Sequence, residues 1–416
     1  MSLDIELREH AQPTQWPLAP AVGQALAASR IVEAVPDPFM PDLWRLKASS
    51  KVGSVTVSVR GYDPVRLRII PKVPIARLFF LLGYALNPKG WRDDPTDAAA
   101  HHELLPALAH SFERQTERAL RQGLLQGYRR AEETALVLRG RIREAEQIRR
   151  RFGSSLPVEI AFDEFTTDIA ENQLLKAAAE RLLRLDGVPE PVRRRLLRHR
   201  ASLIDITAPV RGDRLPGWRP SRLNVRYQPA LGLAELILRG SSVEHPAGAV
   251  RIEGFLFDMN RVFEDFVCVA LREALPVGGS VELQAHGIHL DDGRAVRMKP
   301  DLVWFDGTRH PLAVVDAKYK AEKPEGFPDA DLYQLLAYCT ALGLREGHLV
   351  YAKGNAEHGA HDVRNAGIRI HQHTLDLDQQ PQLLLAEINE IARRIPEGGS
   401  PESPGHFSDV AGPTCR

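Results

Sequence analysis

The sequence predicts a multidomain α+β protein, with a small β module and a helical region in its first half and an α/β domain near its end. At 416 residues the chain is too long for one typical domain. An early segment, SVTVSVRG, alternates Val with small polar residues, which is the period of a half-buried strand. From residue 251 onward, strand-like and helix-like segments alternate, a pattern typical of an α/β domain.

Composition, Gly and Pro divide the chain into predicted segments. The first half is expected to contain a loosely ordered lead-in over residues 1–40, a small β module plus helix over 41–95, and a helical region over 96–205. A connector rich in Gly and Pro follows over 206–250, then the α/β domain over 251–395 and a disordered tail over 396–416.

Each element follows from its local pattern. In the first half, strands are expected at 43–49, 54–61, 64–72 and 158–162, and helices at 75–86, over much of 97–151, from about 167 and at 192–204. In the α/β domain, strands are expected at 281–290, 301–305, 311–319, 347–352 and 367–375, and helices at 257–275, 329–343 and 381–395.

Charge balance, cysteine content and hydropathy narrow the class of protein to which the chain can belong. The 54 basic residues balance the 54 acidic ones, which weakens a nucleic-acid-binding role without removing it, because a local basic patch suffices. Three cysteines without a CxxC pair support neither a disulfide framework nor a structural zinc site and fit a reducing cytoplasm. The sequence has no signal-peptide pattern and no apolar run of membrane-spanning length, so no membrane role is expected.

A turn signal at Asp306-Gly307 predicts an antiparallel hairpin between the two strands that flank it. A loop over residues 306–311 sets Asp301 opposite Asp316, whereas a two-residue loop sets Asp301 opposite Leu312. The longer loop is favoured because Pro311 cannot donate a ladder hydrogen bond.

Two carboxylates and one ammonium then converge at the end of this hairpin. Asp316 and Lys318 project from one face of a strand, with Cα atoms about 6.6 Å apart. Carboxylates at the end of a buried strand are costly unless they are paired or bind a cation, and oxygen ligands of this kind suit Mg²⁺. In the simpler alternative, Asp301 caps a strand and Asp316 pairs with Lys318 at the surface, because so short a motif also occurs by chance.

Residues on two predicted helices favour the metal site. Glu264 shares a helical face with the packing residues Val267, Cys268 and Leu271. Gln334 and Tyr338, four residues apart, share a face of the helix that follows the second hairpin strand.

Residues 251–395 resemble the PD-(D/E)xK nucleases, with Pro300-Asp301 and the Asp316-Ala317-Lys318 tripeptide matching the defining motif. Residues Gln334 to Tyr338 match the Gln-x-x-x-Tyr of the RecB-like branch. The resemblance implies a restriction-endonuclease-like domain with a mixed central sheet and one Mg²⁺ site. It implies Glu264, Asp301 and Asp316 as metal ligands, Lys318 as a further catalytic residue, and Gln334 and Tyr338 as DNA-binding or supporting residues.

A wider set of segments resembles the McrC family of McrBC-type modified-DNA restriction systems. These segments are IPKVPIARLFFLLGYAL, LRGRIREAEQIRR, EIAFDEFTTDIAENQLLKAAAERLL, FDMNRVFEDFV and VVDAKYK. The resemblance implies a Mg²⁺-dependent DNA endonuclease subunit in a restriction and defence complex. Its partner would be a hexameric McrB-like AAA+ GTPase ring whose GTP hydrolysis is stimulated by residues 41–205 of this chain.

The chain itself has no GxxxxGK[ST] phosphate-binding loop, so a separate GTPase is expected. Two alternatives stay open at this point. In the first alternative, the protein is a non-catalytic assembly factor that activates the ring. In the second, it is a stand-alone RecB-like nuclease.

Overall fold

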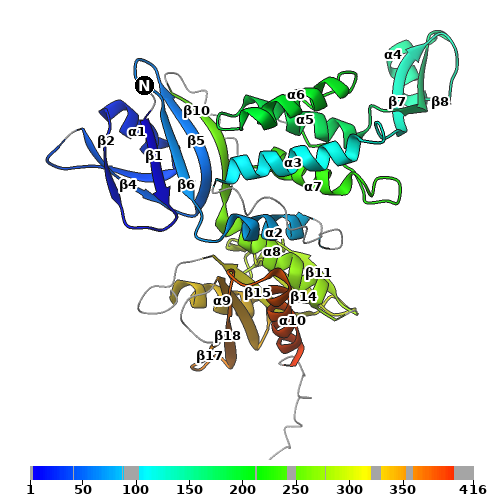
Figure 1. Ribbon diagram of the computed structural model, residues 1–416. Helices are drawn as coiled ribbons and strands as arrows, with labels where there is room; N and C mark the ends of the chain where they lie inside the picture. The colour runs from blue at the N-terminus through cyan, green and yellow to red at the C-terminus, as the bar shows by residue number, and fades with distance from the viewer. Residues whose placement is uncertain are drawn as a thin grey trace, which may run out of the picture. The chain divides into compact units, whose positions relative to one another are not determined.

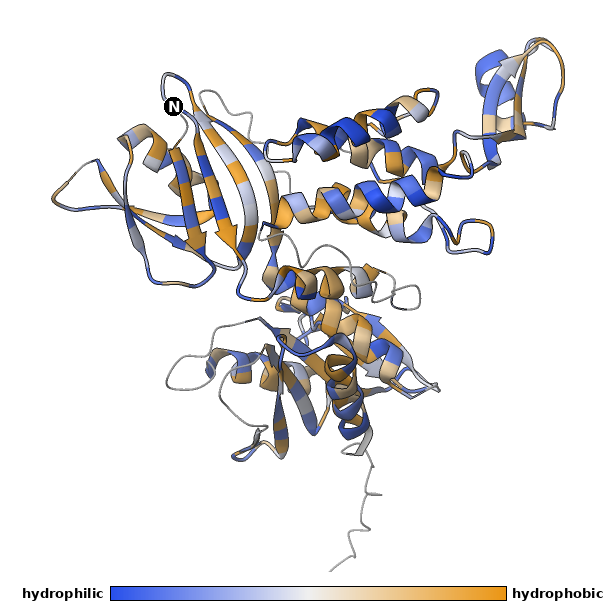
Figure 2. Ribbon diagram, viewed as in Figure 1, coloured by the Kyte–Doolittle hydropathy of each residue, from blue (hydrophilic) through white to orange (hydrophobic). Residues whose placement is uncertain are grey.

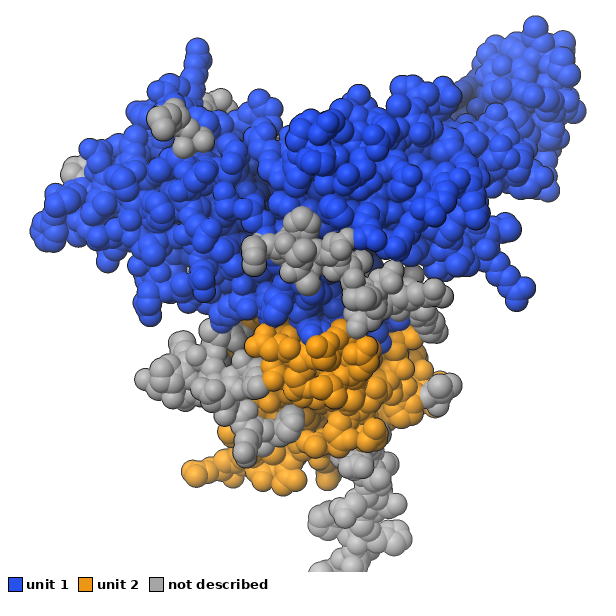
Figure 3. Space-filling view, viewed as in Figure 1, with its two compact units in different colours: residues 1–259 blue, residues 260–416 orange. Residues whose placement is uncertain are grey.

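The protein, seen in a computed structural model, divides into two compact units, residues 1–259 and residues 260–416 (Figure 3). The structure describes residues 3–40, 42–86, 88, 103–210, 213–240, 250–276, 278–319, 329–352 and 359–397. The predicted tail lies outside these residues from 398 onward. Each unit is built from both helices and strands (Figure 1), so the predicted mixed α/β architecture is confirmed.

Two sheets open the first unit. One has the order β1-β6-β5-β10, in which β1 and β6 run parallel and the other pairs antiparallel, and the second has the antiparallel order β2-β4-β3. Valines alternate along β5 and are buried on one face, and Figure 2 shows this alternation as bands of both colours. The elements are β1 (Leu3–Arg8), β2 (Thr14–Pro17), α1 (Pro20–Ser29), β3 (Val32–Pro36), β4 (Leu43–Ala48), β5 (Lys51–Val59), β6 (Val65–Ile70) and β10 (Val250–Asp258).

The prediction of a loosely ordered lead-in over residues 1–40 is wrong. This segment supplies three strands and helix α1, and Ile5, Leu7, Leu26 and Ile31 are buried. The strands are only four to six residues long, and β1 is fixed by parallel pairing with β6 far along the chain. Non-local pairing therefore decides the structure where the local signal is weak.

A group of helices forms the next part of the first unit. Helix α5 packs on α6 and α7, and α3 packs on the same two helices. Their apolar stripes are buried, as the sequence predicts for an amphipathic helical region. The elements are α2 (Ile75–Leu86), α3 (Leu104–Leu120), α5 (Ala170–Arg184), α6 (Glu190–Ser202) and α7 (Gln228–Arg239).

The predicted connector over residues 206–250 differs from the structure at both its middle and its end. Helix α7 lies within it and buries Leu231, Ala234 and Ile237. A proline in its first turn starts this helix, since proline is tolerated there, so prolines alone do not mark a connector. Strand β10 begins at Val250, the last residue of this segment, and otherwise lies in the predicted α/β domain of residues 251–395, yet it completes the first sheet by pairing with β5.

The prediction of a helix or helix pair over residues 97–151 holds only in part. After α3 the chain forms β7 (Gly127–Ala135), β8 (Arg141–Ile142) and α4 (Glu144–Arg151). Strands β7 and β8 flank β9 (Val158–Thr166) in a small antiparallel sheet. Exposure alternates along β7, and the many Arg and Glu residues there had masked this period of two. Residues 127–166 are called the β7–β9 module below.

The second unit is built on one mixed sheet with the order β11-β14-β15-β16-β18-β17. Strands β15, β16 and β18 run parallel, and antiparallel pairs extend the sheet at both ends. Helix α9 covers one face, where Leu335 and Cys339 join Val303, Val314 and Leu349 in the core. The elements are α8 (Met259–Ala274), β11 (Ser280–Leu283), β12 (Ile288–His289), β13 (Arg297–Met298), β14 (Leu302–Phe305), β15 (Pro311–Lys318), α9 (Asp329–Leu342), β16 (Glu346–Ala352), β17 (Gly359–Val363), β18 (Ile368–Leu375) and α10 (Pro381–Glu397).

The predicted mixed central sheet is therefore confirmed in the second unit. Among the described residues of both units, no helix combines the length and the apolar character needed to span a membrane.

Candidate functional site

The hairpin of β14 and β15 places Asp301 and Asp316 side by side. Leu302 pairs with Val315, so the next position outward sets Asp301 opposite Asp316, as the longer loop predicts. The register shifts after Trp304, and Phe305 pairs with Pro311 instead of the expected Leu312. The shift is a local bulge beside the turn and leaves the acidic end of the hairpin in its predicted register.

Backbone and side-chain contacts hold these acids in place. The Ala317 backbone N–H donates to Asp301 Oδ2 at 2.9 Å. The Lys318 ammonium forms an ion pair with Asp316 Oδ2 at 2.5 Å. Asp301 is 7% exposed and Asp316 only 1%, so this is a buried site and not the surface ion pair of the simpler alternative.

Gln284 links Glu264 of α8 to Asp301. The Gln284 side-chain amide donates to Glu264 Oε1, and it lies 3.3 Å from Asp301 Oδ1 as a second donor contact. The structure thus brings together Glu264, Asp301, Asp316 and Lys318, the residues that sequence reasoning had selected. It adds Gln284, which no motif in the sequence marks.

Burial and like charge raise the pKa values of the acids and so disfavour their ionised forms. Burial is the main cause that raises the pKa of Asp301 to about 6, and the nearby charge of Glu264 adds to it. Burial, followed by the charge of Asp301, raises the pKa of Asp316 to about 7. Burial also raises the pKa of Glu264. Such perturbed carboxyl groups in one cluster are typical of a functional site.

The surroundings of Lys318 favour its charged form, unlike those of the acids. Burial lowers the pKa of its ammonium, but the charge and hydrogen bond of Asp316 outweigh burial, so the pKa is raised. Lys318 is therefore a cation at neutral pH, and it offsets part of the negative charge of the cluster.

Gln334 and Tyr338 lie beside this cluster on α9. The Gln334 amide donates to the Tyr338 hydroxyl at 2.8 Å, and that hydroxyl donates to the Lys299 carbonyl oxygen at 3.3 Å. Tyr338 is buried in the core under the sheet, while Gln334 is exposed. Burial, followed by the charge of Asp316, raises the pKa of Tyr338.

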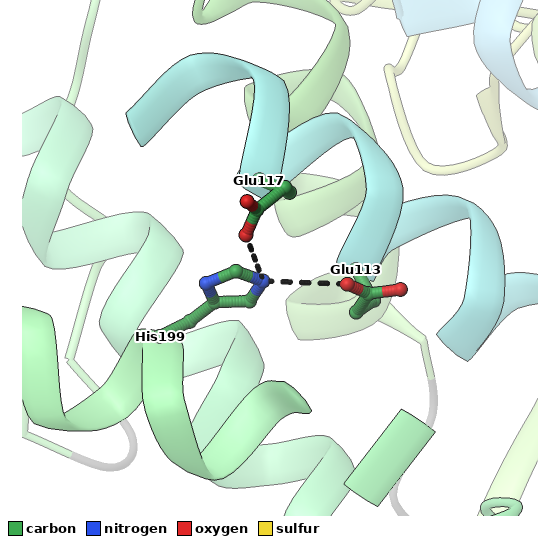
Figure 4. A group of neighbouring side chains, drawn as sticks. All are labelled: Glu113, Glu117 and His199. Atoms are coloured by element: carbon green, nitrogen blue, oxygen red, sulfur yellow. Dashed lines mark ion pairs between the residues drawn. The ribbon is translucent and has the colours of Figure 1, made fainter. Parts of the chain in front are cut away.

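A second group of potential metal ligands lies in the first unit. Glu113 and Glu117 of α3 and His199 of α6 bring one ligand atom each to within 4.8 Å of one another (Figure 4). Sequence reasoning missed this group because the two helices are far apart in the chain and the residues form no spaced motif.

Comparison with protein-family models matches residues 46–352 to the family described as McrBC 5-methylcytosine restriction system component. The chain belongs to this family. The match covers both the β module and the hairpin that carries Asp301 and Asp316. No curated protein matches the McrBC-family chain.

Two solved structures are similar to the McrBC-family chain. One is the refined half-complex from a tetradecameric assembly of Thermococcus gammatolerans McrB AAA+ hexamers with bound McrC, with a TM-score of 0.55 and 18% identity over 94% of this chain and 100% of that chain. This likeness supports a shared fold. The other is the Thermococcus gammatolerans McrBC complex, with a TM-score of 0.38 and 19% identity over 65% of this chain and 88% of that chain.

Proposed function

We propose that this McrBC-family chain is a Mg²⁺-dependent DNA endonuclease subunit that cuts DNA when it is coupled to a McrB-like AAA+ GTPase. The observation that carries the proposal is the convergence of three buried or half-buried carboxyl groups with one ammonium, at Glu264, Asp301, Asp316 and Lys318. Asp316 and Lys318 lie on β15, an interior strand of the mixed sheet, and Asp301 directly precedes the neighbouring strand β14, which fits the nuclease resemblance of the sequence.

The side chains suit a hard divalent cation. The site offers carboxylate oxygens, which Mg²⁺ prefers, and the raised pKa values of Asp301 and Asp316 reflect burial and like charge that a cation would offset. Asp301, Asp316 and Glu264 would hold the ion. Bound Mg²⁺ would polarise the scissile phosphate and favour ionisation of a water molecule.

The protein's own groups have distinct tasks in this proposal. The Ala317 N–H and the Gln284 amide fix the orientation of Asp301, because each of its oxygens accepts one of these hydrogen bonds. Lys318 is held by Asp316 in its charged form. A charged ammonium is a poor general base, so Lys318 would stabilise negative charge on the phosphate.

A hexameric ring of a McrB-like AAA+ GTPase is the proposed partner. The similar solved assembly consists of McrB AAA+ hexamers with bound McrC. The proposed contact lies within residues 41–205, where the β7–β9 module is drawn beyond the ends of the helices in Figure 1. This module exposes an unusual number of large apolar side chains, at Tyr128, Leu136, Val137, Leu138, Phe152 and Phe165, and exposed apolar clusters mark interaction sites.

Plasmid cleavage with the partner, GTP and Mg²⁺ tests the proposal. We expect Asp316→Ala to abolish cutting while it leaves stimulation of GTP hydrolysis intact. Asp292→Ala is the matched control, because Asp292 is an exposed carboxylate of the same unit outside the cluster. Cutting that survives in Asp316→Ala rejects the proposed site.

The same assay separates the alternatives. Stimulation of GTP hydrolysis by a wild-type chain that never cuts would favour the assembly factor. Cutting without any GTPase would favour the stand-alone nuclease.

A further inference from the structure

His199, on α6, directs a buried ring nitrogen toward two glutamates of α3 (Figure 4). Its Nε2 atom lies 3.6 Å from Glu113 Oε1 and 3.7 Å from Glu117 Oε2. His199 is 4% exposed, and its Nε2 makes no hydrogen bond to any residue that the structure describes. Both separations exceed the normal range for a hydrogen bond. The three side chains therefore point toward one another without a hydrogen bond from His199 Nε2 to either glutamate.

The spacing is close to that of ligands around a small cation. Imidazole nitrogen and carboxylate oxygen bind Zn²⁺ at about 2.1 Å, and tetrahedral geometry then separates two ligand atoms by about 3.4 Å. The two observed distances lie within a few tenths of an ångström of this value.

The helices present these ligands from a stable scaffold. Glu113 and Glu117 are one helical turn apart on α3, so they share a face. Arg195, one turn before His199 on α6, donates to Glu113 Oε2 at 2.8 Å and leaves Oε1 directed at His199. An outer partner of this kind orients a metal ligand.

The exposed edge of the group provides access. The Glu117 side chain is 58% exposed, whereas Glu113 and His199 are buried. An ion could therefore enter from the Glu117 side and retain a water molecule as its fourth ligand.

We propose that Glu113, Glu117 and His199 form a binding site for a divalent transition-metal ion of the zinc type, which ties α3 to α6. An imidazole beside carboxylates favours Zn²⁺ or a similar ion, while Mg²⁺ favours oxygen ligands alone. The site lies in the first unit and is independent of the proposed nuclease site in the second. A protonated His199 paired with the two glutamates, without metal, is the competing arrangement.

Zinc titration of the chelator-treated full-length chain tests this site. The Asp316→Asn background removes a ligand of the proposed Mg²⁺ site, so that metal binding there does not obscure the result. In this background we expect Zn²⁺ to bind with a stoichiometry near one and to raise Tm by about 5 °C at a hundredfold excess over Kd. Mg²⁺ at the same concentration should give no rise.

Adding Glu117→Gln should remove both the bound Zn²⁺ and the rise in Tm. The metal-free fold should be unaffected, because Glu117 is exposed. Glu190→Gln is the matched control, since Glu190 is an exposed acid of α6 and its loss should leave Zn²⁺ binding unchanged.

Cobalt provides an independent readout. Co²⁺ bound in place of Zn²⁺ should give the visible absorption of a tetrahedral site, and His199→Gln should abolish it. Zinc binding that persists unchanged in Glu117→Gln, or no Zn²⁺ binding by the chelator-treated chain, overturns the proposal in favour of the metal-free ion pairs.

Discussion

The Gln284 side-chain amide donates a hydrogen bond to the Glu264 carboxylate, and so links the loop after β11 to helix α8. The same amide also lies 3.3 Å from Asp301 Oδ1. Gln284 adopts a left-handed backbone conformation with φ of 52°, which costs a non-glycine residue about 1 kcal/mol or more. Such strain persists where the surrounding structure fixes it, and here it aims the amide between two acids.

We expect Gln284→Asn to lower the cleavage rate about 10-fold to 100-fold, which is the usual effect of losing a residue that orients metal ligands. Asn tolerates the left-handed conformation better than most residues, so the backbone should be kept while the shorter amide no longer spans Glu264 and Asp301. Initial rates of plasmid cleavage measure the effect. Asn365→Gly is the matched control, because Asn365 is also left-handed, with φ of 60°, in a turn of the same unit. Equal rates for Gln284→Asn and wild type would exclude a positioning role.

Removal of the metal should have a thermal signature that is independent of cleavage. Mg²⁺ bound to the folded protein and not to the unfolded chain raises Tm. We expect a rise of a few degrees in the wild type, and none in Asp316→Asn, because one of the buried ligands is lost. Differential scanning calorimetry with and without Mg²⁺ measures this. Asp292→Asn should keep the full rise, and a rise that survives in Asp316→Asn would place the ion elsewhere.

The β7–β9 module offers a separate test of partner binding. Leu136, Val137 and Leu138 are 73%, 71% and 55% exposed. Their joint replacement by Ser should therefore leave Tm within about 1 °C of wild type while stimulation of the partner's GTP hydrolysis falls at least 10-fold, since each large apolar contact is worth about 1.5–3 kcal/mol when buried. The GTPase rate as a function of the concentration of this chain measures the effect.

Leu223→Ser is the control for that experiment. Leu223 is 82% exposed and lies outside the module, so its replacement should leave stimulation unchanged. If the triple variant stimulates as well as wild type, the partner binds another part of residues 41–205.

The second unit was largely predictable because its information is local. Apolar segments such as Leu302–Phe305 and Pro311–Lys318 are bounded by turn residues, and their predicted pairing sets Leu302 opposite Val315, although Pro311 itself joins the ladder opposite Phe305. Asp301, Asp316 and Lys318 lie at or near the ends of these two strands, whereas Glu264 lies within helix α8. Gln284 could not be predicted in the same way, because its role arises from a backbone conformation and from contacts with a distant helix.

The first unit was harder to predict because its strands pair over long distances. β10 is separated from its partner β5 by most of the residues of the unit. The sequence of β7 resembles a charged helical segment, and only its pairing with β9 shows that it is a strand. In both cases the partner strand, absent from any local window, decides the structure. The group of Glu113, Glu117 and His199 could not be predicted from the sequence for the same reason. Its side chains come together only when α3 packs on α6.

Asp168 holds the turn between β9 and α5 to the chain after α6, and it predicts a dependence of stability on pH. Its Oδ1 accepts from the Thr207 N–H at 2.9 Å and from the Gln173 amide at 2.9 Å, and its Oδ2 accepts from the Thr207 hydroxyl at 2.7 Å. Burial alone would raise the pKa of Asp168, but these hydrogen bonds and the charge of Arg129 outweigh burial and lower it.

Because the folded-state pKa of Asp168 is lower than the unfolded one, its contribution to stability is present above about pH 4 and is lost as the pH falls through the folded-state pKa. Asp168→Asn should therefore reduce the free energy of unfolding by about 2 kcal/mol at pH 7, and the difference from wild type should shrink below pH 4. Urea unfolding at pH 7, 5, 4 and 3.5 measures the difference. Asp163→Asn, at an exposed position of β9, should match wild type throughout. A deficit in Asp168→Asn that is the same at every pH would show that the ionised carboxylate is not what stabilises this turn.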